Sequence, residues 1–534
     1  MELKRRSRDV WAGWRSWPGP FCRELALGYG LPRGTKGGLD MARIHRRTFL
    51  QGAVATVGGA VAGGSLQSML AQAAGGQPRI RPLEPVADLR DGRVRLWLQP
   101  NFKYRSFHDT DGTPIMLSDG TTLPGRHDGM AAFRARGHNV WLVRNHELNN
   151  PGPAFGPAAP GPDDAPYDAM AQGGTTTTLV TDHGEVLESF TSLNGTQMNC
   201  SGGGMPWGSW ITCEETVNGP DVGPDFTGAS NIPLQQRHGF IFEVPADGKS
   251  DRQPITSAGR FAHEAAAYSP REGIVYLTED NFGFPSGLYR YVPPSNPMQV
   301  GGLENGGVLQ MLRVVGAPNA HLEATQSNGA TYPVDWVDIA DANPTFPYTP
   351  GQTAPTTNND AINHVGNQGR ALGAAHFSRL EGAVFTKGEI YFTSTQGGGA
   401  AETGPDTVTG YGNGAGQIWS YDPKRALLTC HFQSPGTAAL DLPDNITARN
   451  NGATVVLCED GPVDNYIRGL NPDAELFDIA LNRLTRNAPP NAPRFGEEFA
   501  GATFSPNGDT LFVNIQAAQG ITFAIWGPWD RLRV

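Results

Sequence analysis

The chain has 534 residues, with 41 Lys and Arg against 52 Asp and Glu, and a formal net charge of −11. So acidic a chain lacks the basic surface that nucleic-acid binding needs, and we expect no nucleic-acid partner. Charged residues make up only 17%, while 69 glycines and 43 prolines predict many turns between short strands. The hydrophobic fraction of 38% suffices for a globular core and is low for an integral membrane protein.

Residues 41–73 have the features of an export signal. The segment 45–50, with Arg46 and Arg47, precedes a weakly apolar run, and Ala71-Gln72-Ala73 is typical of a cleavage site. Paired arginines in this position predict export by the twin-arginine translocase, so that the protein is periplasmic or secreted. A short membrane anchor is the alternative. The apolar run is shorter than the ~20 residues of a membrane span, so we expect no stable anchor.

Residues 1–40 show no pattern, and we interpret them as an upstream extension that results from start-site choice. Removing residues 1–73 takes away 11 of the 41 basic and four of the 52 acidic residues, which leaves a net charge of −18. An anionic substrate must then be met by bound cations or a local arginine. An exported protein can pair its cysteines, but twin-arginine export carries folded proteins and favours at least one free, metal-binding thiol. The remaining cysteines are Cys200, Cys213, Cys430 and Cys458.

Six apolar runs that end in a polar or acidic group recur along residues 74–534, which we expect to form a single domain. Most run ends are 56–68 residues apart, with one step of 115. This spacing predicts an all-β fold, a six-bladed β-propeller, although hairpins of a β-sandwich would look similar. The long step, about 281–389, predicts an inserted loop and helix region that covers the channel mouth, with helical character near 370–375. The runs lie at 139–147, 210–215, 274–280, 390–395, 454–460 and 510–516.

Equivalent strand ends of a propeller converge near one mouth of its central channel. Carboxylates far apart in the sequence can therefore meet there, and such a cluster needs cations to offset its repulsion. Each acid alone would be interpreted as solvent-exposed, but recurrence at one repeat position favours a metal site. The acids at the run ends are Glu147, Glu214, Glu215, Glu279, Asp280, Glu459 and Asp460.

The segment 199–215 combines a thiol, a glycine-rich turn, a short strand and two adjacent carboxylates. A thiolate suits a transition metal, and several carboxylate oxygens suit Ca²⁺. The alternative is a glycine turn with a buried thiol and two solvated acids. Further clusters of possible ligands lie at His263-Glu264, at 369–381 with Arg370, His376, Arg379 and Glu381, and at Asp444-Asn445.

Together these motifs resemble the PhoX family of alkaline phosphatases. The resemblance covers about 140–465, and the Asn-Cys-Ser-Gly-Gly and Thr-Cys-Glu-Glu parts of 199–215 are its most specific elements. It implies a six-bladed propeller with a mixed centre of Fe³⁺ and Ca²⁺ that hydrolyses phosphate monoesters. A small-molecule phosphate ester is then the expected substrate, and we expect a monomer.

The resemblance also implies roles for individual residues. Cys200 corresponds to the thiolate that bridges two irons, and Arg379 to the arginine that holds the phosphate; both are expected to be catalytic. Where the family has Asp-Arg-Pro-Glu, this chain has Ser378-Arg379-Leu380-Glu381, and it is shorter than the phosphatases that define the family, so the substrate range stays open. The implied metal ligands are Glu214, Glu264 and Glu381, with Glu147, Glu215, Glu459 and Asp444 as further ligands or supporting groups.

Two other function classes remain. The same kind of site could hydrolyse phosphodiesters, phosphotriesters or lactones, or the ions could be structural in a propeller that acts as a binding scaffold. A second basic group beside the carboxylates would favour a monoester dianion, and its absence would favour a neutral or singly charged substrate.

Overall fold

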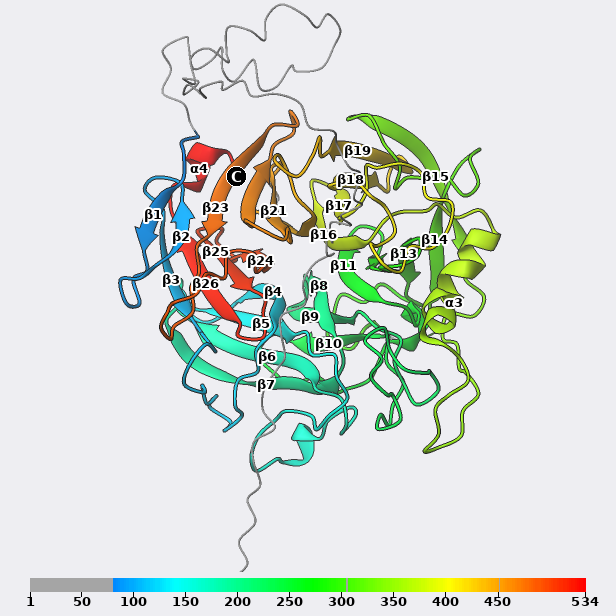
Figure 1. Cartoon of the computed structure of the whole chain (residues 1–534), viewed down its shortest axis with the longest axis horizontal. Coiled ribbons are helices and arrows are strands. Elements are labelled where there is room, and N and C mark those ends of the chain that lie inside the picture. Colours follow the sequence, from blue (N-terminus) through cyan, green and yellow to red (C-terminus); the bar gives the residue numbers. More distant parts are fainter. Residues whose placement is uncertain (1–79, 304–305, 451) are drawn as a thin grey trace, which may run out of the picture. The chain divides into compact units, whose positions relative to one another are not determined.

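The computed structural model describes residues 80–303, 306–450 and 452–534, so the predicted signal segment lies outside the described residues. Within them, 26 strands form five antiparallel sheets whose innermost strands face a common centre (Figure 1). The fold is all-β and propeller-like, as predicted. No helix among the described residues is long and apolar enough to cross a membrane.

The sheets use the chain mostly in sequence order. The first contains β4 (His127–Arg134), β5 (Val140–His146), β6 (Gly173–Val180) and β7 (Val186–Thr196), and the second β8 (Asn199–Met205), β9 (Ser209–Glu214) and β10 (Ile241–Pro245). The third has the order β11 (His263–Ser269), β12 (Ile274–Glu279), β13 (Leu288–Val292), β14 (Val308–Val314), β15 (Ala330–Asp338), β19 (Leu427–Gln433), β18 (Gln417–Asp422), β17 (Glu389–Ser394) and β16 (Leu380–Thr386).

The last two sheets join both ends of the described chain. One has the order β1 (Glu84–Ala87), β2 (Val94–Leu98), β23 (Leu476–Asn482), β22 (Tyr466–Leu470), β21 (Val455–Glu459) and β20 (Pro443–Ala448). The other has the order β24 (Phe499–Phe504), β25 (Thr510–Ile515), β26 (Ile521–Trp526) and β3 (Lys103–Phe107). Because β2 and β3 cover the strands β23 and β26, these late strands present no open edge for pairing with another chain.

The six apolar runs of the sequence are all strands, namely β5, β9, β12, β17, β21 and β25. Each is the second strand from the centre, next to an innermost strand. All residues of β21 and β25 are buried, since Val456, Leu511 and Val513 pack into one core between two neighbouring sheets. Burial on both faces explains why these strands are continuously apolar rather than alternating.

The innermost strands contact one another in a closed series. β4 contacts β8, and the series continues through β11, β16, β20 and β24 back to β4. Figure 1 shows β4, β8, β11, β16 and β24 close to the centre. The first residues of these six strands, although distant in sequence, therefore gather around one point.

Residues 281–389, expected as an inserted loop and helix region, also supply strands β13 to β16. β15 pairs with both β14 and β19 and thereby joins two sets of strands into the nine-stranded sheet. The helix in this segment is α3 (Asn358–Ala371), earlier than expected. Thr357 caps its start, and Gly373, with a φ of 88°, adopts a conformation that favours glycine and lies just beyond its end. The other helices among the described residues are α4 (Trp529–Leu532) and the 3₁₀ turns Pro162–Asp164 and Thr256–Ala258.

Candidate metal centre

One position in the innermost strands carries most of the candidate chemistry. It is the second residue of the strand, which is an acid or a thiol in five of the six strands. In β24 it is Ala500, and an acid, Glu498, stands just before the strand instead. Because these positions converge, side chains from distant parts of the sequence meet at the centre. The five residues are Asp128, Cys200, Glu264, Glu381 and Asp444.

A β-bulge at this position re-aims the side chains. The register between the innermost strand and its neighbour shifts here in all six pairs, for example between His263 and Ala266. A bulge bends its strand and turns a side chain away from the regular alternation. The neighbouring backbones also approach closely, because a Cβ on Gly382 would lie only 2.9 Å from the Cα of Asn445. Glycine is needed where the strands converge this tightly.

The donor atoms form three connected groups of possible metal ligands. Within each group, one ligand atom from each residue lies within 4.8 Å of the others. The first group contains a thiol, whereas the other two offer only carboxylate oxygens. Glu264 is shared by the first two groups and Asp444 by the last two. The groups are Cys200 with Glu215 and Glu264, Glu264 with Glu381 and Asp444, and Asp444 with Asp460 and Glu498.

Glu264 is a buried carboxyl group whose charge needs compensation. Its side chain is fully buried, and neither carboxylate oxygen meets a hydrogen-bond donor of suitable geometry among the described residues. Burial and the neighbouring Glu215 and Asp444 raise the pKa of Glu264 well above its usual value. A buried carboxylate without a partner is costly, so either protons or metal ions must compensate the charge. The residues present therefore fit a metal centre.

Burial and neighbouring acids also raise the pKa values of Asp128 and Cys200 in this cluster. Burial, together with nearby Glu147, raises the pKa of Asp128 to about 8. Burial, with nearby Asp128 and Glu264, also raises the pKa of the Cys200 thiol well above its usual range. The Sγ atom of Cys200 lies 3.5 Å from Oδ2 of Asp128. The thiolate that metal binding requires would thus form only beside a cation.

Arg379 brings a fixed positive charge to the edge of the cluster. Its Nη2 atom lies 2.8 Å from Oδ2 of Asp280 and 2.9 Å from Oε1 of Glu381. Arg379 directly precedes β16 and has a φ of 39°, a conformation that is uncommon for a residue other than glycine. Its guanidinium faces the ring of Phe282 at 5.5 Å, and its side chain is 17% exposed. The arginine is therefore held at the cluster from three sides.

The sequence matches the family described as Alkaline phosphatase PhoX over residues 83–519. The chain belongs to the PhoX family of alkaline phosphatases. Among solved structures it is similar to Pseudomonas fluorescens PhoX in complex with vanadate, a transition state analogue. The identity is 17%, the match covers 84% of this chain and 97% of that chain, and the TM-score is 0.58. This similarity supports the propeller-like fold, and the family match confirms the resemblance seen in the sequence.

Two gluconolactonases are similar at a lower level. For the one from Xanthomonas campestris the identity is 11%, with 84% of this chain and 99% of that chain covered and a TM-score of 0.33. For the periplasmic gluconolactonase of Pseudomonas aeruginosa the identity is 13%, with 83% and 91% covered and a TM-score of 0.34. A comparison with curated protein sequences found no match.

Five of the ligands predicted for this PhoX family member lie together in the three groups: Cys200, Glu215, Glu264, Glu381 and Asp444. The described cysteines, Cys200 among them, are all free thiols. Glu147 lies beside the groups without belonging to them, because its carboxylate accepts hydrogen bonds from Arg126 and Gln516. The sequence thus identified every member of the first two groups.

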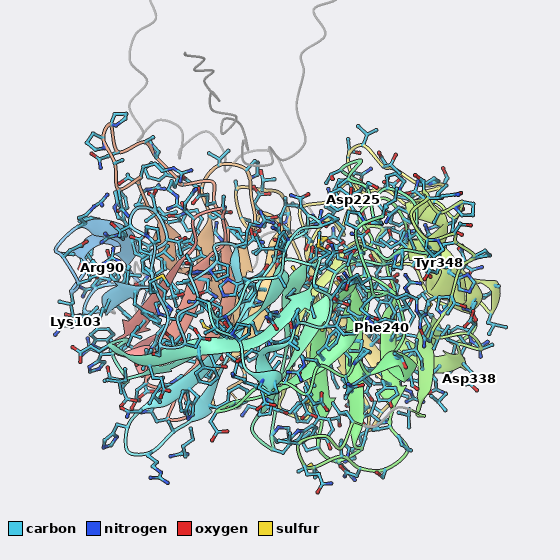
Figure 2. The ribbon with its side chains drawn as sticks, turned by 90° about the horizontal axis from the view of Figure 1, so that it is seen from below. Arg90, Lys103, Asp225, Phe240, Asp338 and Tyr348 are labelled. Carbon is cyan, nitrogen blue, oxygen red and sulfur yellow. The ribbon has the colours of Figure 1, made fainter. Side chains whose placement is uncertain are left out.

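Glu214 and Glu459, also predicted as ligands, have other partners in the structure. Glu214 bonds to Nδ1 of His238 at 2.6 Å and accepts the backbone N–H of Phe240, a buried residue that Figure 2 labels. Glu459 bonds to Nε of Arg468 at 2.6 Å and accepts two backbone N–H groups. Both end a strand, so their side chains point to the face opposite that of the next residue. That next residue, Glu215 or Asp460, is the one in the cluster.

Three acids of the cluster were not predicted as ligands: Asp128, Asp460 and Glu498. Asp460 was noted only as the end of an apolar run. Asp128 follows a histidine at the start of its strand, as Glu264 does, and this shared pair is a signal that could have identified it. Glu498 follows no apolar run, so nothing in the repeat pattern points to it.

Beyond the bulges, the innermost strands line a cavity of about 390 Å³. It begins at Ser201 and Asn445, the residues that follow Cys200 and Asp444, and it continues along Ala266, Ala383 and Ala502. Its wall combines small side chains with large ones such as Phe133 and Trp210 and contains no member of the three ligand groups. The candidate ligand groups among the described residues thus lie where the innermost strands begin, outside this cavity.

His238 is expected to stabilise the fold in a pH-dependent way. Burial opposes its charge, but Glu214 and Asp168 outweigh this effect and raise its pKa to about 9 from the usual 6.5. Because the folded pKa is raised, the stabilisation is complete below pH 6.5 and is lost as the pH rises through about 9. At 1.36 kcal/mol per pKa unit it is on the order of 3 kcal/mol.

His238→Gln should therefore lower the melting temperature at pH 6, and the difference from wild type should shrink towards pH 10. His364→Gln is the matched control. His364 lies on α3, is partly exposed, and has its Nε2 atom 3.0 Å from Oδ2 of Asp341. An equal loss of stability by His238→Gln at both pH values would contradict a charged His238.

Proposed function

We propose that this chain is an exported, metal-dependent phosphatase that hydrolyses phosphate monoesters at a mixed iron and calcium centre. One observation carries the proposal: a thiol-containing ligand group continues into two oxygen-only groups, directly beside Arg379. The thiol group suits iron, and the oxygen-only groups suit Ca²⁺. Membership in the PhoX family supports phosphatase chemistry.

Each part of the site has a role in this reaction. When bound, the cations supply positive charge to the non-bridging phosphoryl oxygens and to the attacking oxygen. The carboxylates of Glu264 and Asp444 hold neighbouring groups at a fixed separation, because each is shared by two of them. Positive charge held at a fixed place beside the phosphoryl oxygens is the main source of catalysis in phosphoryl transfer.

Arg379 binds the phosphoryl group beside the cations. Asp280 and Glu381 engage its Nε and Nη2 atoms, so Nη1 of the guanidinium can donate to an equatorial phosphoryl oxygen. The positive φ of Arg379 fixes where its side chain starts. A lysine would supply the charge but not the planar fork of donors.

We also propose that the sheets count as six blades. The nine-stranded sheet would then be two blades joined through β15, one built on β11 and the other on β16. The closed series of six innermost strands, each with its bulge at the same position, supports this count. Arg126, a second basic group beside the acids, favours a multiply charged anion over a neutral lactone or a phosphotriester.

Export by the twin-arginine translocase is part of the proposal and rests on the sequence at 41–73. Lysine at both Arg46 and Arg47 should leave the uncleaved precursor in the cytoplasm. Periplasmic accumulation of that variant at the normal level would argue against this route.

The test of the proposed function is a substrate comparison with the purified exported protein in its metal-loaded form. We expect an aryl phosphate monoester to be hydrolysed with a higher kcat/KM than the matching aryl diester, triester or an aliphatic lactone. Chelation should abolish this activity, and added Ca²⁺ with iron should restore it. Faster hydrolysis of the diester or lactone, or activity that survives complete metal removal, would contradict the proposal.

A further inference from the structure

Arg126 occupies the same repeat position as Arg379. Each residue directly precedes an innermost strand, β4 or β16, and each has a left-handed backbone conformation, with φ of 50° and 39°. Met198 and Leu442 hold the equivalent place before β8 and β20, with φ of 44° and 48°. The backbone geometry therefore does not require arginine. The reason for an arginine at these two positions must therefore lie in its side chain.

The two arginines lie on opposite sides of the acid cluster. In the closed series of innermost strands, β4 and β16 are three strands apart in both directions. On one arc between them, Cys200 lies in β8 and Glu264 in β11, and Glu215 directly follows β9. On the other arc, Asp444 lies in β20, Asp460 directly follows β21 and Glu498 directly precedes β24. The acid cluster therefore has the guanidinium of Arg126 on one side and that of Arg379 on the other.

Arg126 is held in place but keeps free donor capacity. Its Nε donates to the backbone oxygen of Glu147 at 3.0 Å, and Nη2 donates to the Glu147 carboxylate, which also accepts a bond from Gln516. A guanidinium has five N–H groups, and these two bonds use only part of them. Burial opposes its charge, but Glu147, Glu498 and Asp128 outweigh it and raise the pKa further, so the charge is permanent.

Arg126 is also the more accessible of the two. Its side chain is 34% exposed, compared with 17% for Arg379. Arg126 therefore offers a partly exposed guanidinium on the far side of the cluster from Arg379, where a leaving group that points away from Arg379 would lie. In a protein with so many acids, an anionic leaving group would otherwise be repelled.

We propose that Arg126 binds a negative charge on the leaving group and makes the enzyme select phosphate monoesters that carry a second phosphate. The proposal rests on the phosphatase function proposed above. It assigns Arg126 to the leaving group and Arg379 to the reacting phosphoryl group. Discrimination of this kind needs a hydrogen bond to a charged group that only one class of substrate can make.

The test compares fructose 1,6-bisphosphate with fructose 1-phosphate. When the phosphate at C1 is cleaved, the leaving group of the first carries a phosphate and that of the second does not. Phosphate release by the metal-loaded protein is measured for wild type and Arg126→Gln. We expect Arg126→Gln to lower kcat/KM for the bisphosphate by at least about tenfold and for the monophosphate by less than about threefold. The double variant Arg126→Gln/Glu147→Gln should show the same selective loss, which excludes an effect of leaving Glu147 unpaired.

Arg486→Gln is the matched control, because Arg486 is similarly exposed and contacts Gln519 of the neighbouring loop. It should leave the ratio of the two kcat/KM values unchanged. Equal losses for both substrates in Arg126→Gln, or no loss for the bisphosphate, would overturn the assignment. Failure of the wild type to hydrolyse either substrate would instead contradict the proposed function itself.

Discussion

Glu264→Gln should remove the enzymatic activity almost completely and lower the metal content of the purified protein. Glu264 lies between two ligand groups, so the loss of its charge weakens both at once. An amide keeps the shape of the carboxylate but is a much poorer ligand for iron and Ca²⁺. We expect kcat/KM for an aryl phosphate to fall by roughly a thousandfold or more, on the scale of losing a main electrostatic element.

The same substitution should have opposite effects on stability with and without metal. In the metal-loaded protein it should lower the melting temperature, because ligand binding stabilises the folded state. In the chelated protein at pH 8 it should raise the melting temperature. There the raised pKa of Glu264 means that folding requires the carboxyl group either to be buried as a charge or to take up a proton, and the amide removes this cost.

Glu323→Gln is the matched control for Glu264→Gln. Glu323 is also fully buried, and burial raises its pKa, but it belongs to none of the ligand groups. It should retain wild-type metal content and activity. Unchanged metal content in Glu264→Gln would show that the three groups do not form the metal centre.

Arg379→Ala should lower kcat/KM for an aryl phosphate by about 2–4 kcal/mol of transition-state stabilisation while the metals stay bound. The arginine contributes its charge and its directed N–H groups where negative charge grows on the phosphoryl oxygens. Arg379→Lys should recover only part of the loss, since a point charge lacks the planar fork. Kinetics and metal analysis should be done on the same preparation. A lower kcat/KM with unchanged metal content indicates that Arg379 binds the phosphoryl group, whereas a lower metal content indicates that the metal centre is lost.

Arg370→Ala is the control from the same segment. Arg370 lies in the same cluster of the sequence as Arg379, but its guanidinium bonds to the oxygen of Pro285 and to Asn363 and Asn367 of α3. Its removal should leave kcat/KM within about threefold of wild type. If Arg379→Ala kept full activity with full metal content, Arg379 would only pair with Asp280 and Glu381.

The sequence predicted the strand next to each of the six innermost strands, because these strands are largely buried and consist of apolar runs. The innermost strands gave no such signal, since glycine and alanine dominate where their backbones converge, as at Gly203 and Ala266. Of the run ends predicted as ligands, only Glu215 belongs to the three groups, whereas Cys200, Glu264, Glu381 and Asp444 were predicted from the motifs that carry the family resemblance. Glu214 and Glu459 end their strands, while Glu215 and Asp460 are the first residues beyond them.

The parts that could not be predicted depend on contacts between distant segments. The pairing of β15 with β19, which joins residues 330–333 to residues 427–430, leaves no trace in local periodicity. The bulges that aim Asp128 and Glu264 at the centre are likewise a property of strand pairing. The spacing of residues alone did not decide whether Cys200 is a metal ligand or a buried thiol. The family resemblance predicted that it is a ligand.

The central claim is that Cys200, Glu215 and Glu264 hold iron as a free-thiolate site. Anomalous diffraction at the iron edge from crystals of the metal-loaded protein tests it most directly. We predict an anomalous peak within bonding distance of Cys200 Sγ, about 2.3 Å by analogy with other metal–thiolate bonds, and loss of that peak in Cys200→Ser. An iron peak elsewhere, or a disulfide at Cys200 with no metal beside it, would contradict the account.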